Sequence, residues 1–469
     1  MTTAGGVCFR PLTEVAAHYR RGELSPTELT RLFLDRIDRL DRSLHAFITV
    51  AADRALEDAA KADRRLARGD PGLLIGIPIA VKDSIATAGM RTTGNSRVLE
   101  DWVPHRDAAV IERLRSAGAV IIGKTNLNEF GWSIPTPDDL CPPPRNPWNP
   151  EYAAVGSSSG SAVAVSAGMT TAALGTDGGG SVRLPAGQMG LVGFKATHGL
   201  VSRVGVLHAG SIGDVGPLAR TVADAAALLQ VLAAYDRDDP DARPRAHADY
   251  LGSLDGGVRG MRVGIPRSYL DAVSVETEVS AAFDLALDEL ARLGVTVTAV
   301  EIPALVYARA ANFVVLNAEH YAAHEAVLRL QWARYGRSAR LYLAQGAFLT
   351  AADYLRAREV GRLARLAIDE VLQHVDVLAM PTSPVVTAEA ARRPDVHRRG
   401  IGASFTSPFN LTGHPALSVP CGMSAVGLPV GLQLVGRHYD EATLLRLAHA
   451  YEQATAWHTM CPPERVAAR

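Results

Sequence analysis

The 469-residue sequence predicts an α/β fold in which helices cover both faces of a central β-sheet. From about residue 73, short apolar segments typical of strands alternate with segments that have the apolar spacing of helices. The same alternation resumes after residue 375, behind a section that is mostly helical. The composition, with 48% hydrophobic and 21% charged residues, is that of an ordinary globular protein.

We expect one continuous domain of four sections, because no repeat and no low-complexity linker divides residues 1–469. Residues 1–70 form a helical lead-in, residues 71–230 a catalytic core, residues 231–375 a mostly helical covering section, and residues 376–469 a return to the core sheet. Strands are predicted at 73–81, 119–123, 172–177, 261–266, 295–303, 376–382, 416–422 and 430–436, and helices at 26–40, 108–118, 159–168 and 440–454.

Charge and cysteine content exclude several classes of function. The net charge of −1 offers no basic excess for binding phosphates or an anionic membrane, so neither nucleic acid nor a membrane is expected as a partner. The four cysteines have no metal-ligand spacing, and we expect no metal and no cofactor. The N-terminal segment becomes polar too early for a signal peptide, and no apolar run reaches the roughly 18 residues of a membrane span. A cytoplasmic enzyme is expected.

Lysine is rare in this chain, since only four of the 48 basic residues are lysines. A desolvated lysine can lose its proton at working pH whereas an arginine cannot, so each lysine is a candidate for chemistry. Lys61 lies in a charged helical segment typical of the surface. Lys82 follows the apolar run 73–81, so its ammonium group is expected at the end of a buried strand, either as a base or as an ion-pair partner of Asp83.

Residues 155–186 contain two turns rich in glycine and serine on either side of a helix and a strand. In the second turn, Gly178, Gly179 and Gly180 precede Ser181, so backbone N–H groups can point at an oxygen that develops negative charge. This arrangement is typical of an oxyanion hole beside a nucleophile. A tight glycine turn packed against a helix explains this segment equally well.

Several separate segments resemble the amidase signature family in order and spacing. They are IGIPIAVKD, GAVIIGKTNLNEF, RNPWNP, GSSSGSAVAVSAG, GTDGGGSVRLPA, GLVGFKATHGLVSR, GPLARTVADAA, NLTGHPALSVPCG and GLPVGLQLVG. The resemblance covers nearly the whole chain and is weakest over residues 235–400. It implies a mixed, twisted sheet and an enzyme that hydrolyses amide-type carbon–nitrogen bonds without a cofactor.

Residue by residue, the resemblance implies a Ser-Ser-Lys relay: Ser181 is the nucleophile, Lys82 the general base, and Ser157 the bridging serine after a cis peptide bond from Gly156. The backbone N–H groups of the glycine turn, with that of Ser181, would form the oxyanion hole. Thr176, Asp177 and Arg183 match positions that support this turn. Val155 and Ser159 depart from the family, which usually has glycine at both positions.

Two other enzyme patterns also occur in the sequence. Residues 118–125 match the P-loop expression GxxxxGK[ST], although the residues between the glycines read as a buried strand. Residues 156–160 match the GxSxG elbow of α/β-hydrolases, which would make Ser158 the nucleophile with a histidine such as His198, His208 or His414. The segment before that turn contains prolines and reads as a loop rather than a strand.

The expected partner is a small-molecule amide or carbamate, and the expected assembly is a monomer or homodimer. Trp132 and Ser133 match a family segment near the acyl pocket, where Trp132 either contacts an apolar substrate or packs in the core. A carbamate or ester hydrolase is one alternative. Another is the glutamine-hydrolysing subunit of a tRNA-dependent amidotransferase, but the arginine and aspartate that hold glutamine in such subunits align with Gly361 and Ala403.

Overall fold

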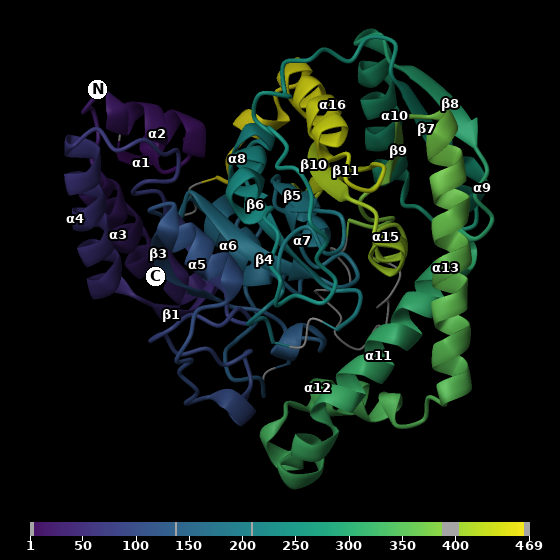
Figure 1. The fold of residues 1–469 in the computed structure, drawn as a ribbon, viewed down its shortest axis with the longest axis horizontal. Helices are drawn as coiled ribbons and strands as arrows, with labels where there is room; N and C mark the ends of the chain where they lie inside the picture. The colour runs from purple at the N-terminus through teal and green to yellow at the C-terminus, as the bar shows by residue number, and fades with distance from the viewer. Residues whose placement is uncertain (1–3, 137, 208–209, 387–402, 464–469) are drawn as a thin grey trace.

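An 11-stranded sheet of mixed direction runs through the molecule, in the order β1-β3-β2-β4-β6-β5-β10-β11-β9-β7-β8 (Figure 1). It is seen in a computed structural model that describes residues 4–136, 138–207, 210–386 and 403–463. The pairs β2/β3, β2/β4, β7/β8 and β7/β9 are parallel and the other pairs are antiparallel. The strands are β1 (Phe47–Val50), β2 (Pro78–Lys82), β3 (Val120–Thr125), β4 (Ala172–Asp177), β5 (Val192–Lys195), β6 (Asp214–Ala219), β7 (Arg262–Pro266), β8 (Thr296–Val300), β9 (Val377–Pro381), β10 (Ala416–Met423) and β11 (Pro429–Val435).

Helices connect these strands and cover the sheet, as the sequence predicts. The helix that starts at Pro26 has a capping box, in which the Ser25 hydroxyl accepts from the Glu28 N–H and the Glu28 carboxylate accepts from the Ser25 N–H. The helices are α1 (Ala4–Val7), α2 (Leu12–Arg20), α3 (Pro26–Leu44), α4 (Ala52–Ala67), α5 (Ala109–Ser116), α6 (Ser159–Ser166), α7 (Arg183–Gln188), α8 (Val222–Leu232), α9 (Arg267–Asp271), α10 (Thr277–Arg292), α11 (Leu305–Leu330), α12 (Arg337–Gly346), α13 (Ala351–His374), α15 (Ser407–Thr412) and α16 (Glu441–Ala454).

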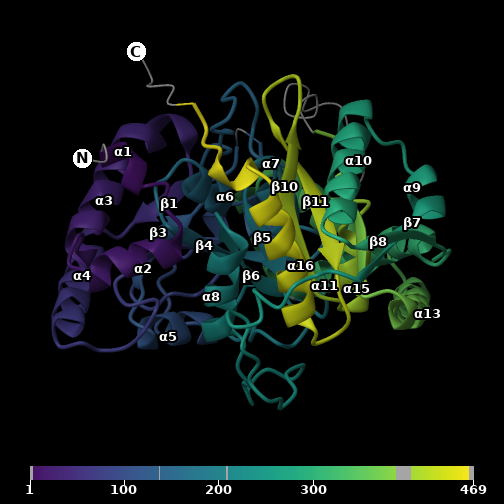
Figure 2. The ribbon, with the colours of Figure 1, turned by 90° about the horizontal axis from the view of Figure 1, so that it is seen from above.

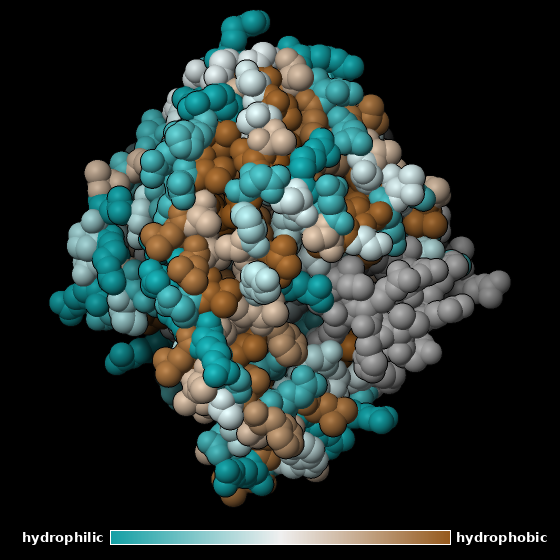
Figure 3. All heavy atoms as spheres, turned by 90° about the vertical axis from the view of Figure 1, so that its right-hand side faces the viewer, coloured by the Kyte–Doolittle hydropathy of each residue, from teal (hydrophilic) through white to brown (hydrophobic). Residues whose placement is uncertain are grey.

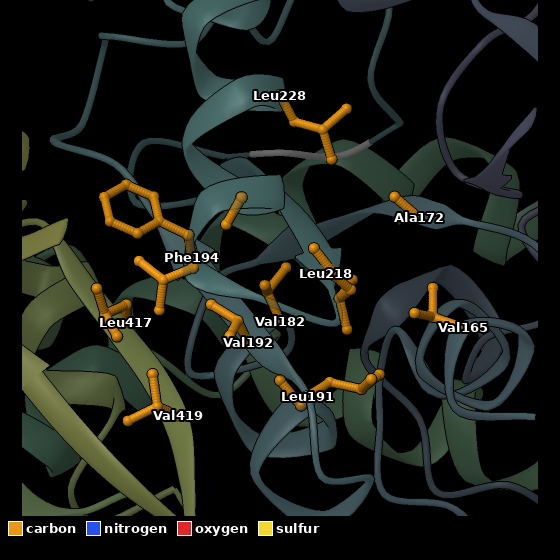
Figure 4. Packing of buried hydrophobic residues seen from close by; sticks show 14 of the residues in the cluster. Val165, Ala172, Val182, Leu191, Val192, Phe194, Leu218, Leu228, Leu417 and Val419 are labelled. Atoms are coloured by element: carbon orange, nitrogen blue, oxygen red, sulfur yellow. The ribbon is translucent and has the colours of Figure 1, made fainter. Parts of the chain in front are cut away.

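The central strands are buried by helices on both faces (Figure 2). Figure 4 shows Leu228 of α8 on one side of the sheet and Val165 of α6 on the other, with Leu218 and Phe194 from the strands between them. All four side chains are fully buried. Because a sheet buried on both faces needs apolar residues at nearly every position, strands such as β2 and β3 read as continuous apolar runs in the sequence.

Two sections of the chain contribute strands where the sequence indicated mainly helices. The lead-in contains the short strand β1, which pairs antiparallel with β3 at one edge of the sheet. The strands β7 and β8 of the covering section lie where they were predicted, but they extend the same sheet at its opposite edge. Strand β1 has strand-favouring residues, Phe-Ile-Thr-Val, but with only four of them and no regular alternation it was too short to be predicted.

The long helices α11 and α13 pack against each other beside the sheet, and α12 connects them (Figure 1). Figure 3 views the molecule from this side, where hydrophobic and hydrophilic residues are interspersed. Leu355, Leu363 and Leu366 of α13 are among the exposed apolar side chains. In the part of the chain that the structure describes, no helix is both long and apolar enough to cross a membrane.

Candidate active site

The predicted relay residues and the glycine turn lie at the carboxyl ends of two central parallel strands, β2 and β4. Lys82 is the last residue of β2 and Asp177 the last residue of β4. Parallel strands have their carboxyl ends on the same side of the sheet, and ligands bind beside these ends in many open α/β sheets. The glycine turn 178–180 follows β4 directly and leads through Ser181 into α7.

Lys82 is completely buried, and its ammonium group contacts hydroxyl groups. Its Nζ donates to Ser157 Oγ at 2.7 Å and to Thr176 Oγ1 at 2.8 Å. Burial lowers the pKa of Lys82 to about 7, and the negative charge of Asp177 opposes this shift only in part. A substantial fraction of Lys82 is therefore the neutral amine near neutral pH.

Ser157 lies in the turn before α6, and its peptide bond with Gly156 is cis, as the resemblance implies. The neighbouring Ser158 is held by the backbone of Thr176: its hydroxyl donates to the Thr176 carbonyl and accepts from the Thr176 N–H, both at 3.2 Å. The Ser158 N–H donates to the Ser181 carbonyl at 3.2 Å. This bond joins the two serine-containing turns side by side.

The glycine turn is held by a buried ion pair between Asp177 and Arg183. The Asp177 carboxylate accepts from Arg183 Nε and Nη2, both at 3.0 Å, and from the Gly180 N–H at 2.6 Å. Burial alone would raise the pKa of Asp177, but the Arg183 guanidinium holds it well below its usual range. Arg183 also donates to Asn410 Oδ1 and Gln433 Oε1, which connects the turn to α15 and β11.

The same contacts determine which N–H groups of the glycine turn are free to bind an oxyanion. Because the Gly180 N–H donates to Asp177, it is not free to bind an oxyanion. Within the described residues, the N–H groups of Gly178, Gly179 and Ser181 donate no hydrogen bond, and these three residues are partly exposed. The carbonyls of Gly178 and Gly179 accept from Asn312 and Thr406, which orients the peptide groups.

Gly131 belongs to the family segment matched near the acyl pocket, but it was not among the predicted site residues. It has φ +77°, and a Cβ atom there would lie 3.3 Å from Ser157 Oγ and 3.9 Å from Lys82 Nζ. The preceding Phe130 is also left-handed, with φ +51°. A glycine beside an expected pocket segment was visible in the sequence, but its distance from Ser157 depends on a turn that only the fold reveals.

Trp132 and Ser133 lie one and two residues beyond this glycine. Trp132 is partly exposed, stacks on His320 with ring centroids 5.1 Å apart, and donates from Nε1 to Asn317 Oδ1 at 3.1 Å. Ser133 is buried, and its hydroxyl has no hydrogen-bond partner among the described residues. His320 and Asn317 belong to α11, so the covering section supplies the environment of Trp132.

The other lysines differ from Lys82 in having carboxylate partners. Lys124 and Lys195 are buried and form ion pairs with Asp83 at 3.5 Å and with Asp214 at 3.1 Å. Lys61 is exposed, as predicted. Lys124 lies within strand β3, so the P-loop interpretation of residues 118–125 is wrong. Of the histidines proposed for the GxSxG interpretation, His208 lies outside the described residues.

The two positions aligned with glutamine-binding residues carry no charge. Gly361 is buried in α13, and a Cβ atom there would lie 2.9 Å from Leu411 Cγ, which leaves no room for a side chain unless Leu411 moves. The Ala403 carbonyl accepts from the Ser407 N–H at 3.0 Å. Neither position offers an ion-pair partner to a bound amino acid.

Known proteins match this chain over nearly its whole length. A Glutamyl-tRNA(Gln) amidotransferase subunit of Thermosynechococcus vestitus is 40% identical, with 94% of this chain and 97% of that protein covered. The solved Glutamyl-tRNA(Gln) amidotransferase subunit from Thermotoga maritima is 35% identical with a TM-score of 0.80, covering 98% of each chain. The peptide amidase from Stenotrophomonas maltophilia is 33% identical with a TM-score of 0.81, covering 95% of this chain and 96% of that one.

These relatives correct the expectation about partners. From the sequence we expected a small-molecule amide or carbamate as the only partner, no nucleic acid, and a monomer or homodimer. This expectation is wrong, because similar proteins are named as one subunit of an enzyme whose name includes glutamyl-tRNA(Gln). The net charge of a single chain misled us, because it does not report on the other subunits of a multi-subunit enzyme.

The family follows from a match that is independent of these individual relatives. Residues 28–445 match the family model described as Amidase. Solved amidases also share the mixed sheet and its covering helices, so the predicted fold class and family are both confirmed. Hydrolysis of carbon–nitrogen amide bonds is the chemistry of this family. The chain belongs to the amidase signature family.

Proposed function

We propose that the protein hydrolyses an amide-type carbon–nitrogen bond with Ser181 as nucleophile and Lys82 as general base, relayed by Ser157. The observation that carries this proposal is the 2.7 Å hydrogen bond from Lys82 Nζ to Ser157 Oγ in a fully buried setting. A serine hydroxyl becomes an effective nucleophile only when a base accepts its proton. Lys82 meets this requirement, because its pKa of about 7 makes the neutral amine accessible.

The proposed reaction proceeds through an acyl-enzyme. Neutral Lys82 accepts a proton from Ser157 while Ser157 accepts one from Ser181, and Ser181 Oγ bonds to the substrate carbonyl carbon. The proton returns through Ser157 to the leaving nitrogen as the C–N bond breaks, so that the amine leaves neutral. A water molecule then releases the acid by the same relay, which restores the Ser181 hydroxyl.

The free N–H groups of the glycine turn fit the role of oxyanion donors. Gly178, Gly179 and Ser181 retain this capacity, whereas Gly180 is assigned to holding the turn through Asp177. Preorganised donors stabilise the tetrahedral intermediate without reorganising during the reaction. Thr176, Asp177 and Arg183 are positioning residues in this proposal: Thr176 orients the Lys82 ammonium, and the ion pair fixes the turn.

Labelling with a fluorophosphonate tests the nucleophile. We expect a single adduct on Ser181 by intact mass and peptide mapping, no adduct in Ser181→Ala, and a loss of kcat/KM of at least about 10³-fold in that variant. Ser158→Ala is the matched control, because the Ser158 hydroxyl is used by the Thr176 backbone, and this variant should still be labelled on Ser181. An adduct on Ser158 in the wild type would refute the relay.

A second candidate function is glutamine hydrolysis as one component of a tRNA-dependent amidotransferase. It is favoured by the names of the relatives, which match this chain at up to 98% coverage. In this case the acyl group is a glutamyl group and the product released is ammonia. The substrate would need other residues for its ammonium and carboxylate, because Gly361 and Ala403 provide no charge.

Substrate choice, and its dependence on added subunits and tRNA, separates the two candidates. The purified chain is assayed with glutamine, with a peptide amide, with an anilide and with an aryl carbamate, each in the presence and absence of the relatives' partner subunits and tRNA. Glutamine turnover that depends on those additions supports the amidotransferase function. Turnover of the other compounds by the chain alone, with none of glutamine, supports an independent amidase.

Trp132 and Ser133 are proposed to border the acyl pocket. Trp132 also packs among His320, Phe313 and Tyr342, so its loss affects packing as well. We expect Trp132→Ala to lower kcat/KM by about tenfold for an anilide, and to leave a small aliphatic amide nearly unchanged, because only the larger substrate contacts the ring. An equal loss for both substrates would assign Trp132 to the core alone.

A further inference from the structure

A cluster of one carboxylate and two imidazoles lies outside the proposed catalytic relay. Asp369 of α13, His414 just after α15 and His438 just after β11 present ligand atoms that all lie within 4.8 Å of one another. Asp369 Oδ1 lies 3.1 Å from His414 Nε2 and 3.1 Å from His438 Nδ1. The two imidazole rings are tilted by 44° relative to each other, with centroids 4.0 Å apart.

The hydrogen-bond partners of Thr412 favour one tautomer of each neutral imidazole. With the Thr412 hydroxyl donating to the Pro408 carbonyl at 3.0 Å, that hydroxyl accepts from His414 Nδ1, which lies 2.9 Å away. The Thr412 carbonyl can only accept, so His438 Nε2, at 3.1 Å, must be its donor. In the neutral imidazoles, His414 Nε2 and His438 Nδ1 are therefore unprotonated.

Three electron-pair donors consequently converge with no hydrogen between them. In these tautomers His414 Nε2, His438 Nδ1 and Asp369 Oδ1 bring lone pairs within 4.8 Å of one another, an arrangement that a cation among them would stabilise. A single metal ion satisfies all three atoms.

We propose that Asp369, His414 and His438 bind a divalent transition-metal ion, for which Zn²⁺ is the best chemical match. Two imidazole nitrogens and one carboxylate oxygen are typical ligands of this ion. The single N–H of each neutral histidine then donates to Thr412, which is the kind of outer contact that orients metal-binding histidines. The Asp369 side chain is 39% exposed, so water can reach the site and complete the coordination, while its other oxygen, Oδ2, pairs with Arg365 at 3.7 Å.

The position of the cluster suggests a structural role for the ion. It ties α13 to the segments that follow α15 and β11. Helix α15 carries Asn410, whose amide donates to the Asp177 carbonyl at 2.7 Å and whose oxygen accepts from Arg183. Metal binding thus stabilises the element that supports the glycine turn, without taking part in the chemistry at Ser181. No sequence motif marks the cluster, because Asp369 lies 45 and 69 positions from its partners.

Metal content and thermal stability test this proposal on the full chain. The protein is stripped with a chelator, incubated with Zn²⁺ and desalted. We expect about one equivalent of zinc by mass spectrometry of the metal, and a rise in Tm of several degrees with excess Zn²⁺. His438→Gln and Asp369→Asn should each weaken Zn²⁺ binding by at least about tenfold in calorimetric titration and abolish the rise in Tm.

Two controls on the same helix make the test specific. His374→Gln and Glu370→Gln remove an exposed histidine and an exposed carboxylate of α13 and should bind Zn²⁺ like the wild type. Co²⁺ added to the stripped wild type should give visible absorption bands of a low-symmetry nitrogen and oxygen site, a readout that does not depend on how variants fold. Zinc binding that persists in His438→Gln, or no binding by the wild type, would overturn the proposal.

Discussion

At the scale of single residues, Lys82 is distinguished by the absence of a carboxylate partner. Three lysines in the described part of the chain are buried, and Lys124 and Lys195 form ion pairs while Lys82 contacts hydroxyl oxygens. A nearby carboxylate favours the charged ammonium, whereas burial without one favours the neutral amine. The sequence predicted strands that end beside Lys82 and Lys124 but none before Lys195, and the carboxylate partners of Lys124 and Lys195 are seen only in the fold.

The pH dependence of catalysis follows from the pKa of Lys82, which is about 7. The general base must be unprotonated, so log kcat/KM should rise with a slope of about one below pH 7 and level off above it. A profile of kcat/KM from pH 5 to 9 on an uncharged amide measures this. A profile that is flat between pH 5 and 7 would contradict the assignment.

Lys82→Arg provides the matched variant for this prediction. Arginine keeps the positive charge but does not deprotonate in this range, so we expect a loss of at least about 10³-fold in kcat/KM at every pH. Fluorophosphonate labelling should slow as well, while circular dichroism reports whether the fold is kept. Activity of Lys82→Arg close to that of the wild type would assign the base to another group.

At the scale of elements, helix α6 shows how a departure from the family pattern is accommodated. Ser159 begins this helix and stands where the family usually has glycine, and its buried hydroxyl has no hydrogen-bond partner among the described residues. Ser161, one position beyond Gly160, is also buried, but its hydroxyl is hydrogen-bonded. It bonds Thr125 Oγ1 at 2.7 Å and donates to the Leu174 carbonyl at 3.0 Å. An unpaired buried hydroxyl costs free energy, whereas a paired one does not.

The two serines should therefore respond oppositely to alanine. Ser159→Ala removes an unsatisfied group and improves helix propensity, so the free energy of unfolding should rise by about 0.5–2 kcal/mol. Ser161→Ala leaves the Thr125 hydroxyl and the Leu174 carbonyl without this partner and should lower it by about 1–3 kcal/mol. Urea denaturation measures the free energy of unfolding of both variants. A lower value for Ser159→Ala than for the wild type would contradict the argument.

At the scale of the whole molecule, the strands of the sheet differ in how well they are protected from solvent. Strands β4 and β6 lie in the middle of the order and every residue of β6 is buried. Strand β8 is at one edge, and three of its five residues are exposed. Local opening requires less free energy where few apolar contacts and neighbouring strands must be broken.

Hydrogen exchange should follow this gradient. We expect peptides from β4 and β6 to exchange slowest and those from β8 to exchange at least about tenfold faster, as measured by mass spectrometry after deuterium labelling. Strand β7, which has β8 on one side and β9 on the other, should be intermediate and serves as an internal reference. Equal protection of β8 and β4 would show that another surface covers this edge.

Local patterns in the sequence were sufficient to predict the fold class, most of the strands and the family. Buried strands such as β2 and β3 are contiguous apolar runs, and the capping box of α3 is a local signal, so both could be read without tertiary information. Lys82, Ser157 and Ser181 were predicted as site residues because they lie in separate motifs that agree in order. The positions of β1 and of Gly131 beside the relay carried no comparable local signal.

The folded chain was needed to learn which groups meet and which are already engaged. Gly180 gives its N–H to Asp177, Ser158 is occupied by Thr176, and Leu411 fills the space beside Gly361. Asp369, His414 and His438 form one cluster although they come from three distant segments. The physical reason is that sequence patterns report burial and local conformation, whereas hydrogen-bond partners, pKa values and metal ligands depend on contacts between segments that chain order does not specify.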